Sequence, residues 1–195
     1  MAKQIDPQRR ERILSITLKL FSEKGYYGVS VGDIAKECEI SRGSLYTYFK
    51  SKQELVNTLY QNWKGVLGEY VGRGLNESQG REKHKTLWRN LVDFACDHPI
   101  ALGFLESQHH ASYLTDDSIK IENDLRDFGV ELYKEFRGDN KRRDEDIQIL
   151  MSVSYGAYIQ LAKEAKKTRI SFCDKSVRLI EESVWRAITI DLEEI

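Results

Sequence analysis

The sequence predicts an all-α protein, with an N-terminal three-helix helix-turn-helix domain followed by a larger helical domain. Only two prolines, Pro7 and Pro99, occur among its 195 residues, and alternating runs of β-branched residues are hard to find. Residues that cap helices recur along the chain and divide it into about nine helices. Hydrophobic residues make up 41% of the sequence, so a packed core is expected.

Three capping signals mark the starts of the first three helices. The dipeptide Asp-Pro at positions 6–7 starts a helix that ends at Gly25. Ser30 and Asp33 form a capping box at the start of the second helix, and Ser41 caps the third. Two such short helices in succession are typical of a helix-turn-helix, and we expect this domain to cover residues 1–51.

A second domain, over residues 52–195, is expected to hold the remaining helices. Ser51 and Glu54 start a helix that runs from Lys52 to near Gly72, and residues 76–83 are expected to form a loop. Further helices are expected over about 85–97, 99–112, 115–138 and 147–167, and from about 171 to the C-terminus. The charged residues 139–146 are predicted to be a loop.

Charge is distributed unevenly between the two parts. Residues 1–52 contain 10 Lys and Arg against 6 Asp and Glu, whereas residues 53–195 contain 20 against 25. A basic head on an acidic body suggests that the head is the part that meets a polyanion.

The start of the chain has no signal-peptide pattern, and no apolar run is long enough to span a membrane. The three cysteines are far apart, which fits a reducing cytoplasm and no metal site.

The start of the third helix carries residues that are suited to contact DNA, because a recognition helix enters the major groove with its N-terminal residues. Arg42 can pair with guanine or with a phosphate, and Gly43 lets the backbone approach the duplex. The hydroxyl groups of Tyr46 and Tyr48 can donate to phosphate oxygens. These features together predict a DNA-binding surface.

Two segments of this region resemble the DNA-binding domain of TetR-family transcriptional regulators. Residues 25–35 read GYYGVSVGDIA and residues 40–55 read ISRGSLYTYFKSKQEL, and the similarity covers about residues 9–56. The resemblance implies a repressor that binds a double-stranded DNA operator as a homodimer and is released by a small-molecule inducer. It also implies the DNA contacts of this chain, which are Ser30, Arg42, Gly43, Ser44, Tyr46, Thr47, Tyr48 and Lys52.

The sequence departs from the family pattern in the helix-turn-helix. Glu39 stands in the turn where the family usually has glycine, and Gly32 stands where arginine is frequent. If the backbone at Glu39 has a positive φ, the side chain there costs about 1 kcal/mol. Val29 and Val31 replace threonines near the start of the second helix, which leaves base contacts from that helix open.

The last two helices are the candidates for the dimer interface. Each carries an apolar stripe at helical spacing, and such stripes are usually plain core, so the interface rests mainly on the resemblance. The first stripe is Ile147, Leu150, Met151, Ser154, Tyr158, Leu161 and Ala165. The second is Val177, Ile180, Val184 and Ile188, with Trp185 beside it.

The middle helices are expected to enclose the inducer. Their aromatic and polar side chains supply the candidates for the pocket, which are Trp63, Trp88, Phe94, Phe104, Glu106, His109, His110, Tyr113, Phe128 and Tyr155. Glu106 and a neighbouring histidine share a helix face, so a buried carboxylate and imidazole could meet a polar group of the ligand. Alternatively, the histidines and Tyr113 satisfy each other at a helix end.

Other functions remain open at this stage. The chain could be a DNA-binding dimer without an inducer, or an activator. Glu106 and His109 have the spacing of half a di-iron site, but no second pair completes it, so no metal, no cofactor and no enzyme activity are expected.

Overall fold

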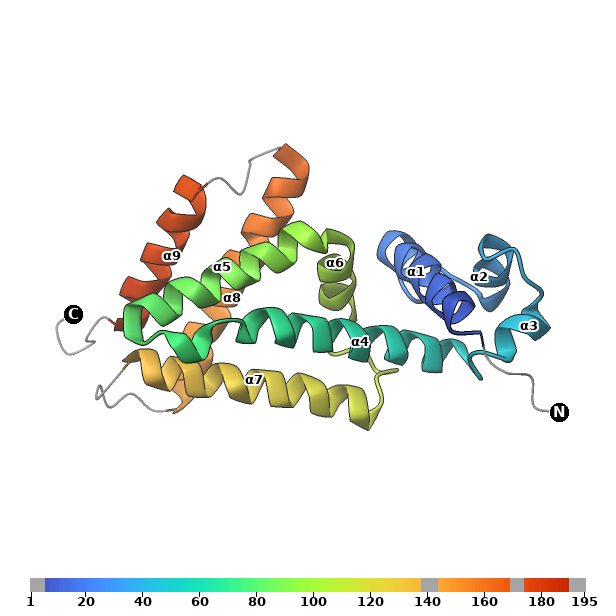
Figure 1. Cartoon of the computed structure of the whole chain (residues 1–195), viewed down its shortest axis with the longest axis horizontal. Coiled ribbons are helices and arrows are strands. Elements are labelled where there is room, and N and C mark those ends of the chain that lie inside the picture. The colour runs from blue at the N-terminus through green and yellow to red at the C-terminus, as the bar shows by residue number, and fades with distance from the viewer. Residues whose placement is uncertain (1–5, 138–143, 169–173, 190–195) are drawn as a thin grey trace. The chain divides into compact units, whose positions relative to one another are not determined.

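The computed structural model describes residues 6–137, 144–168 and 174–189 (Figure 1). Within these ranges the chain forms nine α-helices, one short 3-10 helix and no strand, so the predicted all-α fold is confirmed. The elements are α1 (Pro7–Lys24), α2 (Val31–Glu37), α3 (Arg42–Tyr46), α4 (Lys52–Gly72), the 3-10 helix (Leu75–Glu77), α5 (Gly80–Asp97), α6 (Pro99–Gln108), α7 (Asp116–Arg137), α8 (Asp144–Thr168) and α9 (Asp174–Thr189).

The chain divides into two compact units. Unit 1 contains residues 1–66 and 98–121, and unit 2 contains residues 67–97 and 122–195. Helices α4 and α7 therefore contribute residues to both units. The domain boundary expected after residue 51 stays a prediction.

The capping signals of the first helices are confirmed. The Asp6 carboxylate accepts hydrogen bonds from the N–H groups of Gln8 and Arg9, and the backbone at Gly25 has a φ of 69° that ends α1. Ser30 and Asp33 form both hydrogen bonds of the capping box at the start of α2. These bonds satisfy backbone donors that helix geometry leaves unpaired, so the short helices begin at defined residues.

The core of unit 1 forms where α1 packs against α2 and α6, and α2 packs against α3. Ile13 and Phe21 of α1 are buried with Ile34 of α2 and Leu45 of α3. The ring of Phe21 stacks on that of Phe104 from α6, with centroids 6.4 Å apart. Helix α6 thereby joins the helix-turn-helix in one hydrophobic core.

The turn between α2 and α3 has the strained backbone that the sequence comparison suggested. Glu39 has a φ of 56°, a left-handed conformation that favours glycine. Its carboxylate accepts a hydrogen bond from Arg12 Nη2 at 3.2 Å. Since both side chains are largely exposed, this ion pair offsets only part of the backbone cost of about 1 kcal/mol.

In unit 2, a polar cluster around the buried His84 and Glu181 joins α5 to α9. The Arg81 guanidinium donates to both carboxylate oxygens of Glu181 and, from Nη2, to Glu182 at 2.6 Å. His84 is fully buried, and its Nδ1 lies 2.7 Å from Glu181 Oε1. Aromatic rings surround the imidazole, namely those of Trp88, Phe136 and Trp185.

One predicted loop is wrong in part, and this cluster gives the reason. Residues 76–83 were expected to be irregular, but Leu75–Glu77 is a 3-10 helix and α5 begins at Gly80. Arg81 and His84 lie in the first turns of α5 and pair with α9, about a hundred residues away in the chain. Such long-range contacts leave no periodic signal in the local sequence. The predicted charged loop at 139–146 falls mostly on residues 138–143, which lie outside the described residues.

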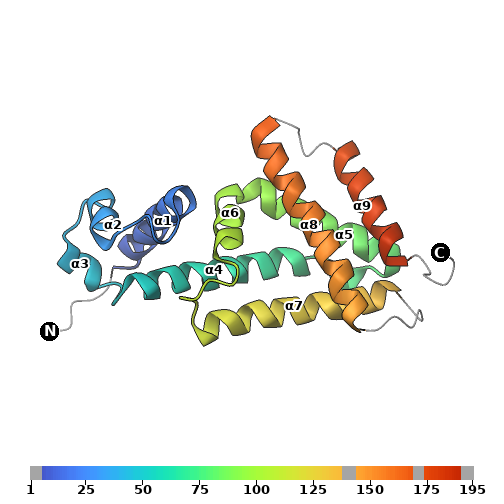
Figure 2. The ribbon, with the colours of Figure 1, turned by 180° about the vertical axis from the view of Figure 1, so that it is seen from behind.

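Part of each apolar stripe expected at the dimer interface packs inside unit 2, and the interface itself stays a prediction. Figure 2 shows α8 and α9 running alongside each other. From the α8 stripe, Ile147, Ser154, Tyr158 and Leu161 are buried, and from the α9 stripe Val184 and Ile188 are buried. The Tyr158 hydroxyl donates to the carbonyl of Leu91 in α5. The side chain of Ala165 lies outside the described residues.

A different face of α8 remains exposed. Ile149 and Val153 are 62% and 54% exposed, and Gly156 lies on the same side of the helix.

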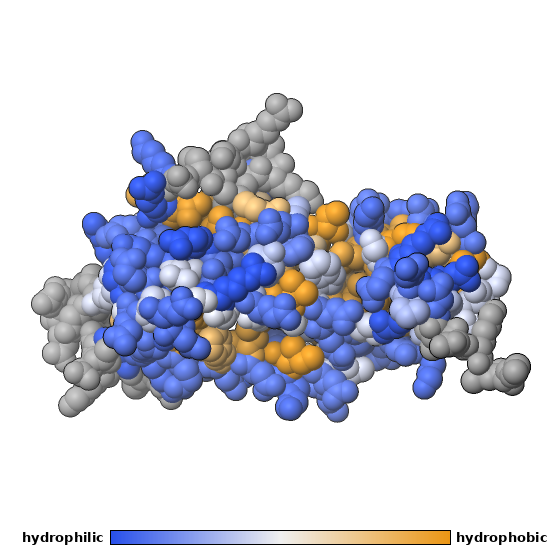
Figure 3. Space-filling model, viewed as in Figure 1, coloured by the Kyte–Doolittle hydropathy of each residue, from blue (hydrophilic) through white to orange (hydrophobic). Residues whose placement is uncertain are grey.

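On the face of the molecule drawn in Figure 3, hydrophilic residues predominate and apolar residues form separate patches. Among the described residues, we find no helix with the length and apolar composition that a membrane span requires.

The buried His84 predicts a dependence of stability on pH. Desolvation lowers the pKa of His84 below its ordinary value of 6.5, although the Glu181 carboxylate opposes the change. The imidazole is therefore neutral in the folded protein at a pH where the unfolded chain already binds a proton. We expect the free energy of unfolding to fall as the pH drops below about 6.5, with a slope of at most about 1.4 kcal/mol per pH unit from this group.

Urea denaturation at a series of pH values measures this slope. His84→Asn retains a donor near Nδ1 for Glu181 but does not titrate, so its curve should be flatter than that of the wild type. His110→Asn, a change at an exposed histidine, is the matched control and should leave the slope unchanged. Equal slopes for the wild type and His84→Asn would contradict the assignment.

Candidate nucleic-acid interface

Helix α3, the predicted recognition helix, is short, and its start and its end are each fixed by contacts within unit 1. Ser41 Oγ accepts the N–H of Ser44 at 3.0 Å, and Leu45 anchors the helix in the core. Tyr46 is 50% exposed, and Arg42 and Gly43 are also exposed. Arg42, Gly43 and Tyr46 of the predicted contact residues therefore lie on α3 and are accessible.

The positive charge at this surface is available to an external anion. Arg42 and Lys50 are exposed, and neither side chain forms an ion pair or hydrogen bond with a residue that the structure describes. A phosphate or a guanine edge would provide the acceptors that the Arg42 guanidinium lacks.

Two of the predicted contact residues already use their hydroxyl groups within the protein. Ser30 Oγ donates to Asp33 Oδ2 at 2.6 Å, and this hydrogen bond lowers the pKa of the Asp33 carboxyl group. The same oxygen of Ser30 accepts the Asp33 N–H. Thr47 Oγ1 donates to the carbonyl of Ser44 at 2.6 Å. Thr47 and Tyr48 lie in the turn that follows α3 and not within it. The roles of these residues in DNA contact stay predictions.

Lys52 links the start of α4 to the turn that follows α1. Its ammonium group donates to the carbonyl oxygens of Tyr26 at 2.8 Å and Val29 at 2.9 Å, and it lies 3.9 Å from the centroid of the Tyr26 ring. Partial burial lowers the pKa of this ammonium group. Two of its three protons are thus donated inside the protein, which leaves one for the predicted phosphate contact.

The opposite face of Tyr26 stacks on Tyr113. The two ring centroids are 3.8 Å apart, and burial raises the pKa of both hydroxyl groups. The Tyr113 hydroxyl donates to Gln108, and not to a histidine as the alternative interpretation suggested. A groove of about 500 Å³ opens here between the turns that follow α1 and α6, with His109 and Tyr113 among its lining residues.

Asn57 is a residue that the sequence analysis missed. It is buried on α4, and its amide donates to the carbonyl of Tyr113 at 2.9 Å. Its Oδ1 accepts from the N–H of Thr115 and from the hydroxyl of Ser118. An asparagine within an otherwise apolar stripe of a helix was the available signal, since a buried amide must find partners.

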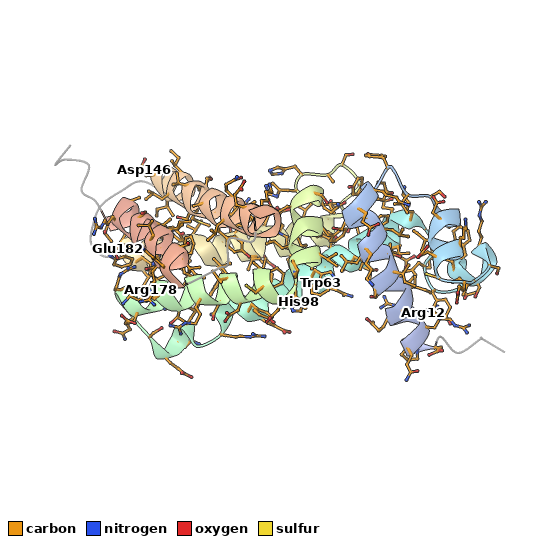
Figure 4. All side chains as sticks on the ribbon, turned by 90° about the horizontal axis from the view of Figure 1, so that it is seen from above. Arg12, Trp63, His98, Asp146, Arg178 and Glu182 are labelled. Atoms are coloured by element: carbon orange, nitrogen blue, oxygen red, sulfur yellow. The ribbon has the colours of Figure 1, made fainter. Side chains whose placement is uncertain are left out.

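The predicted pocket residues are divided between the two units. Trp63, Phe104, Glu106, His109, His110 and Tyr113 belong to unit 1, whereas Trp88, Phe94, Phe128 and Tyr155 belong to unit 2. Trp88, Phe94 and Phe104 are core residues, and Phe128 and Tyr155 are substantially exposed. Figure 4 shows Trp63 beside His98, with ring centroids 5.0 Å apart.

The prediction of a buried imidazole next to Glu106 is wrong. Helix α6 ends at Gln108, short of the predicted end near residue 112, so His109 and His110 lie in the following turn and are exposed. His110 has a left-handed backbone with a φ of 59°, which cannot continue the helix. The existence of a ligand pocket stays a prediction.

Comparison with known proteins assigns the chain to a family. The sequence model for the family described as bacterial regulatory proteins, tetR family, matches residues 13–59. The model described as the tetracyclin repressor-like C-terminal domain matches residues 60–190. The chain belongs to the TetR family.

Relatives of this TetR-family chain extend over nearly its whole length. An uncharacterized HTH-type transcriptional regulator of Haemophilus influenzae is 25% identical over 187 residues, which are 95% of this chain and 98% of the relative. The negative transcriptional regulator of the biofilm operon icaADBC, IcaR, of Staphylococcus aureus is 24% identical over 140 residues, 71% of this chain and 67% of the relative.

Solved structures show the same TetR fold. The crystal structure of a TetR-family transcription regulator from Marinobacter aquaeolei VT8 superposes with a TM-score of 0.77 at 18% identity, covering 92% of this chain and 94% of the other. As a TetR-family protein, the chain is a helix-turn-helix transcriptional regulator, and α2 and α3 are its helix-turn-helix.

Proposed function

We propose that this protein is a homodimeric repressor that contacts its operator with the exposed face of α3 and is released from it by a small molecule. The observation that carries the DNA contact is the accessible, unpaired start of α3, with Arg42 at its first position and Tyr46 half-exposed. Repression is supported by the name of the relative IcaR, a negative regulator. We place its action in the cytoplasm, where Cys38 and Cys96 would remain free thiols.

The exposed face of α8 supports the proposed homodimer. Ile149 and Val153 stand one turn apart, and an open groove of about 600 Å³ runs beside them. A Cβ atom on Gly156 would meet no atom within 4 Å, so a partner helix could approach closely there. Leu179 on α9 is 68% exposed and adds apolar area. We propose that two copies of the chain bury these residues against each other.

Two buried nitrogen atoms of the half-buried Arg137 support a small-molecule ligand and indicate its class. The Nε and Nη1 atoms of Arg137, in the last turn of α7, are buried and have no hydrogen-bond partner among the described residues. A buried charge without a partner is destabilising, because it has lost the hydration that water supplied. A carboxylate or another anionic group on the ligand would accept hydrogen bonds from these atoms. The ligand that we propose is therefore an organic anion.

Binding of DNA tests the first part of the proposal. Arg42→Ala and Tyr46→Ala should each weaken binding to the duplex that the wild type selects from a randomised library by about 5- to 100-fold, because each removes a contact at the major groove. Tyr27→Ala, a change at an 81% exposed tyrosine outside α3, is the matched control and should bind normally. Fluorescence anisotropy gives the affinities, and thermal unfolding checks that each variant is folded.

The salt dependence of the DNA affinity, measured in the same assay, tests whether Lys52 contacts a phosphate. If its remaining proton reaches a phosphate, Lys52→Met should reduce the slope of log affinity against log salt by about 1. An unchanged slope would assign Lys52 to the protein fold alone. Unaltered affinity in both α3 variants would overturn the proposed interface.

The proposed dimer is tested by placing a charge on the α8 face. Val153→Glu should convert the dimer to a monomer at micromolar concentration, since a desolvated, unpaired carboxylate opposes association. Ile119→Glu, at a 43% exposed isoleucine on α7, should remain dimeric. Light scattering after size exclusion measures the mass. A dimeric Val153→Glu protein would place the interface elsewhere.

Arg137→Met tests the anion proposal before any ligand is known. Removal of the two buried donors that lack a partner should raise the free energy of unfolding of the ligand-free protein by about 1 kcal/mol. Arg126→Met, at an exposed arginine of the same helix, should not. Organic carboxylates that raise the melting temperature of the wild type should have no effect on Arg137→Met, and their neutral amides should have none on either. Equal responses of the two proteins would contradict the proposal.

A further inference from the structure

Gly32, the second residue of α2, lies against the side chain of Arg42, the first residue of α3. A Cβ atom built on Gly32 would be 2.4 Å from Arg42 Nη2, 2.9 Å from Nε and 3.0 Å from Cζ. Heavy atoms that are not bonded to each other keep about 3.5 Å apart. The guanidinium group therefore fills space that any side chain at position 32 would need.

The backbone does not require glycine at this position. Gly32 lies within α2, and it is not among the glycines with a positive φ in the part of the chain that the structure describes. The atoms that a Cβ would meet all belong to the far end of a flexible side chain, so alanine can be accommodated once Arg42 moves. Since alanine is the better helix former, Gly32→Ala should fold and melt at a somewhat higher temperature.

The place of the Arg42 guanidinium depends on this contact. Its backbone is fixed at the start of α3 by the Ser41 cap, while its side chain has no hydrogen bond or ion pair with any described residue. The missing Cβ of Gly32 is therefore the feature that admits the guanidinium to the space beside α2. Without that space, the long side chain would extend in another direction from the same backbone.

We propose that Gly32 is a specificity-determining residue, because its missing Cβ lets the Arg42 guanidinium lie against α2 and so sets the base pair that Arg42 reads. Arginine reads guanine through the O6 and N7 acceptors at the major-groove edge, and this pairing depends on where the guanidinium lies. A methyl group at position 32 moves the guanidinium and changes the base preference at that pair. This inference rests on the proposed contact between α3 and the operator.

The test compares base preferences of the full-length protein and its variants. Wild type, Gly32→Ala, Arg42→Ala and the double variant each select duplexes from a randomised library, and anisotropy measures affinities for all single-base changes of the wild-type site. Gly65→Ala is the matched control, since it adds the same methyl group to an exposed position of α4 where a Cβ meets no atom within 4 Å. It should select the wild-type sequence.

We expect Arg42→Ala to lose a preference of about 5- to 100-fold for guanine at one base pair of each half-site. Gly32→Ala should change the preference at that same pair by a comparable factor, and should have no further effect when Arg42 is already alanine. A wild-type base preference in Gly32→Ala would overturn the inference alone. So would an equal effect of Gly32→Ala in the Arg42→Ala background, because position 32 would then act on DNA directly. Failure of the wild type to select any sequence would overturn the proposed function together with this inference.

Discussion

The Lys52 ammonium group lies where the first turn of α4 meets the turn that follows α1. It donates to two backbone carbonyls and lies over the ring of Tyr26 in a cation–π contact. The ring of Tyr26 also stacks on that of Tyr113. A charged donor shared by two carbonyls in a partly buried place is worth more than a neutral hydrogen bond, because little water competes for it. Lys52 thus connects α4 to the turn that follows α1, and Tyr26 connects that turn to the one after α6. The orientation of α3 depends on this junction, since only the residues 47–51 separate α3 from Lys52.

Asn57 extends the same junction one turn along α4. Its amide accepts and donates hydrogen bonds that hold the segment from Tyr113 to Ser118 against the helix. Buried polar groups of this kind specify one arrangement, because any displacement leaves several donors without partners. The segment after α6 is therefore fixed to both α4 and the turn after α1. A movement of α4 or α6 would reach the DNA-binding helices through these contacts.

Several of the predicted DNA-contact side chains also serve the fold of the helix-turn-helix. Ser30 and Thr47 use their hydroxyl groups for a helix cap and a turn, and Lys52 uses two of its protons for the junction. Arg42 and Tyr46 are accessible, and Arg42 is not engaged with any described residue. In the proposed function, discrimination between operators is therefore concentrated in few side chains, of which Arg42 lies against Gly32. In unit 2, by contrast, both carboxylate oxygens of Glu181 contact side chains of the same protein, those of Arg81 and His84.

The sequence by itself determined the fold class, the starts of the first helices and the location of the helix-turn-helix. Caps such as Ser30 and Ser41 act on backbone groups within three residues, so their effect is written in the local sequence. The tertiary structure decided where α5 begins, which face of α8 is exposed, and that His109 and His110 lie outside α6. These features depend on partners far away in the chain: Glu181 stabilises the first turn of α5, and packing within unit 2 selects which of two similar faces of α8 is buried. Periodicity reports that a helix has an apolar face, but not which other segment covers it.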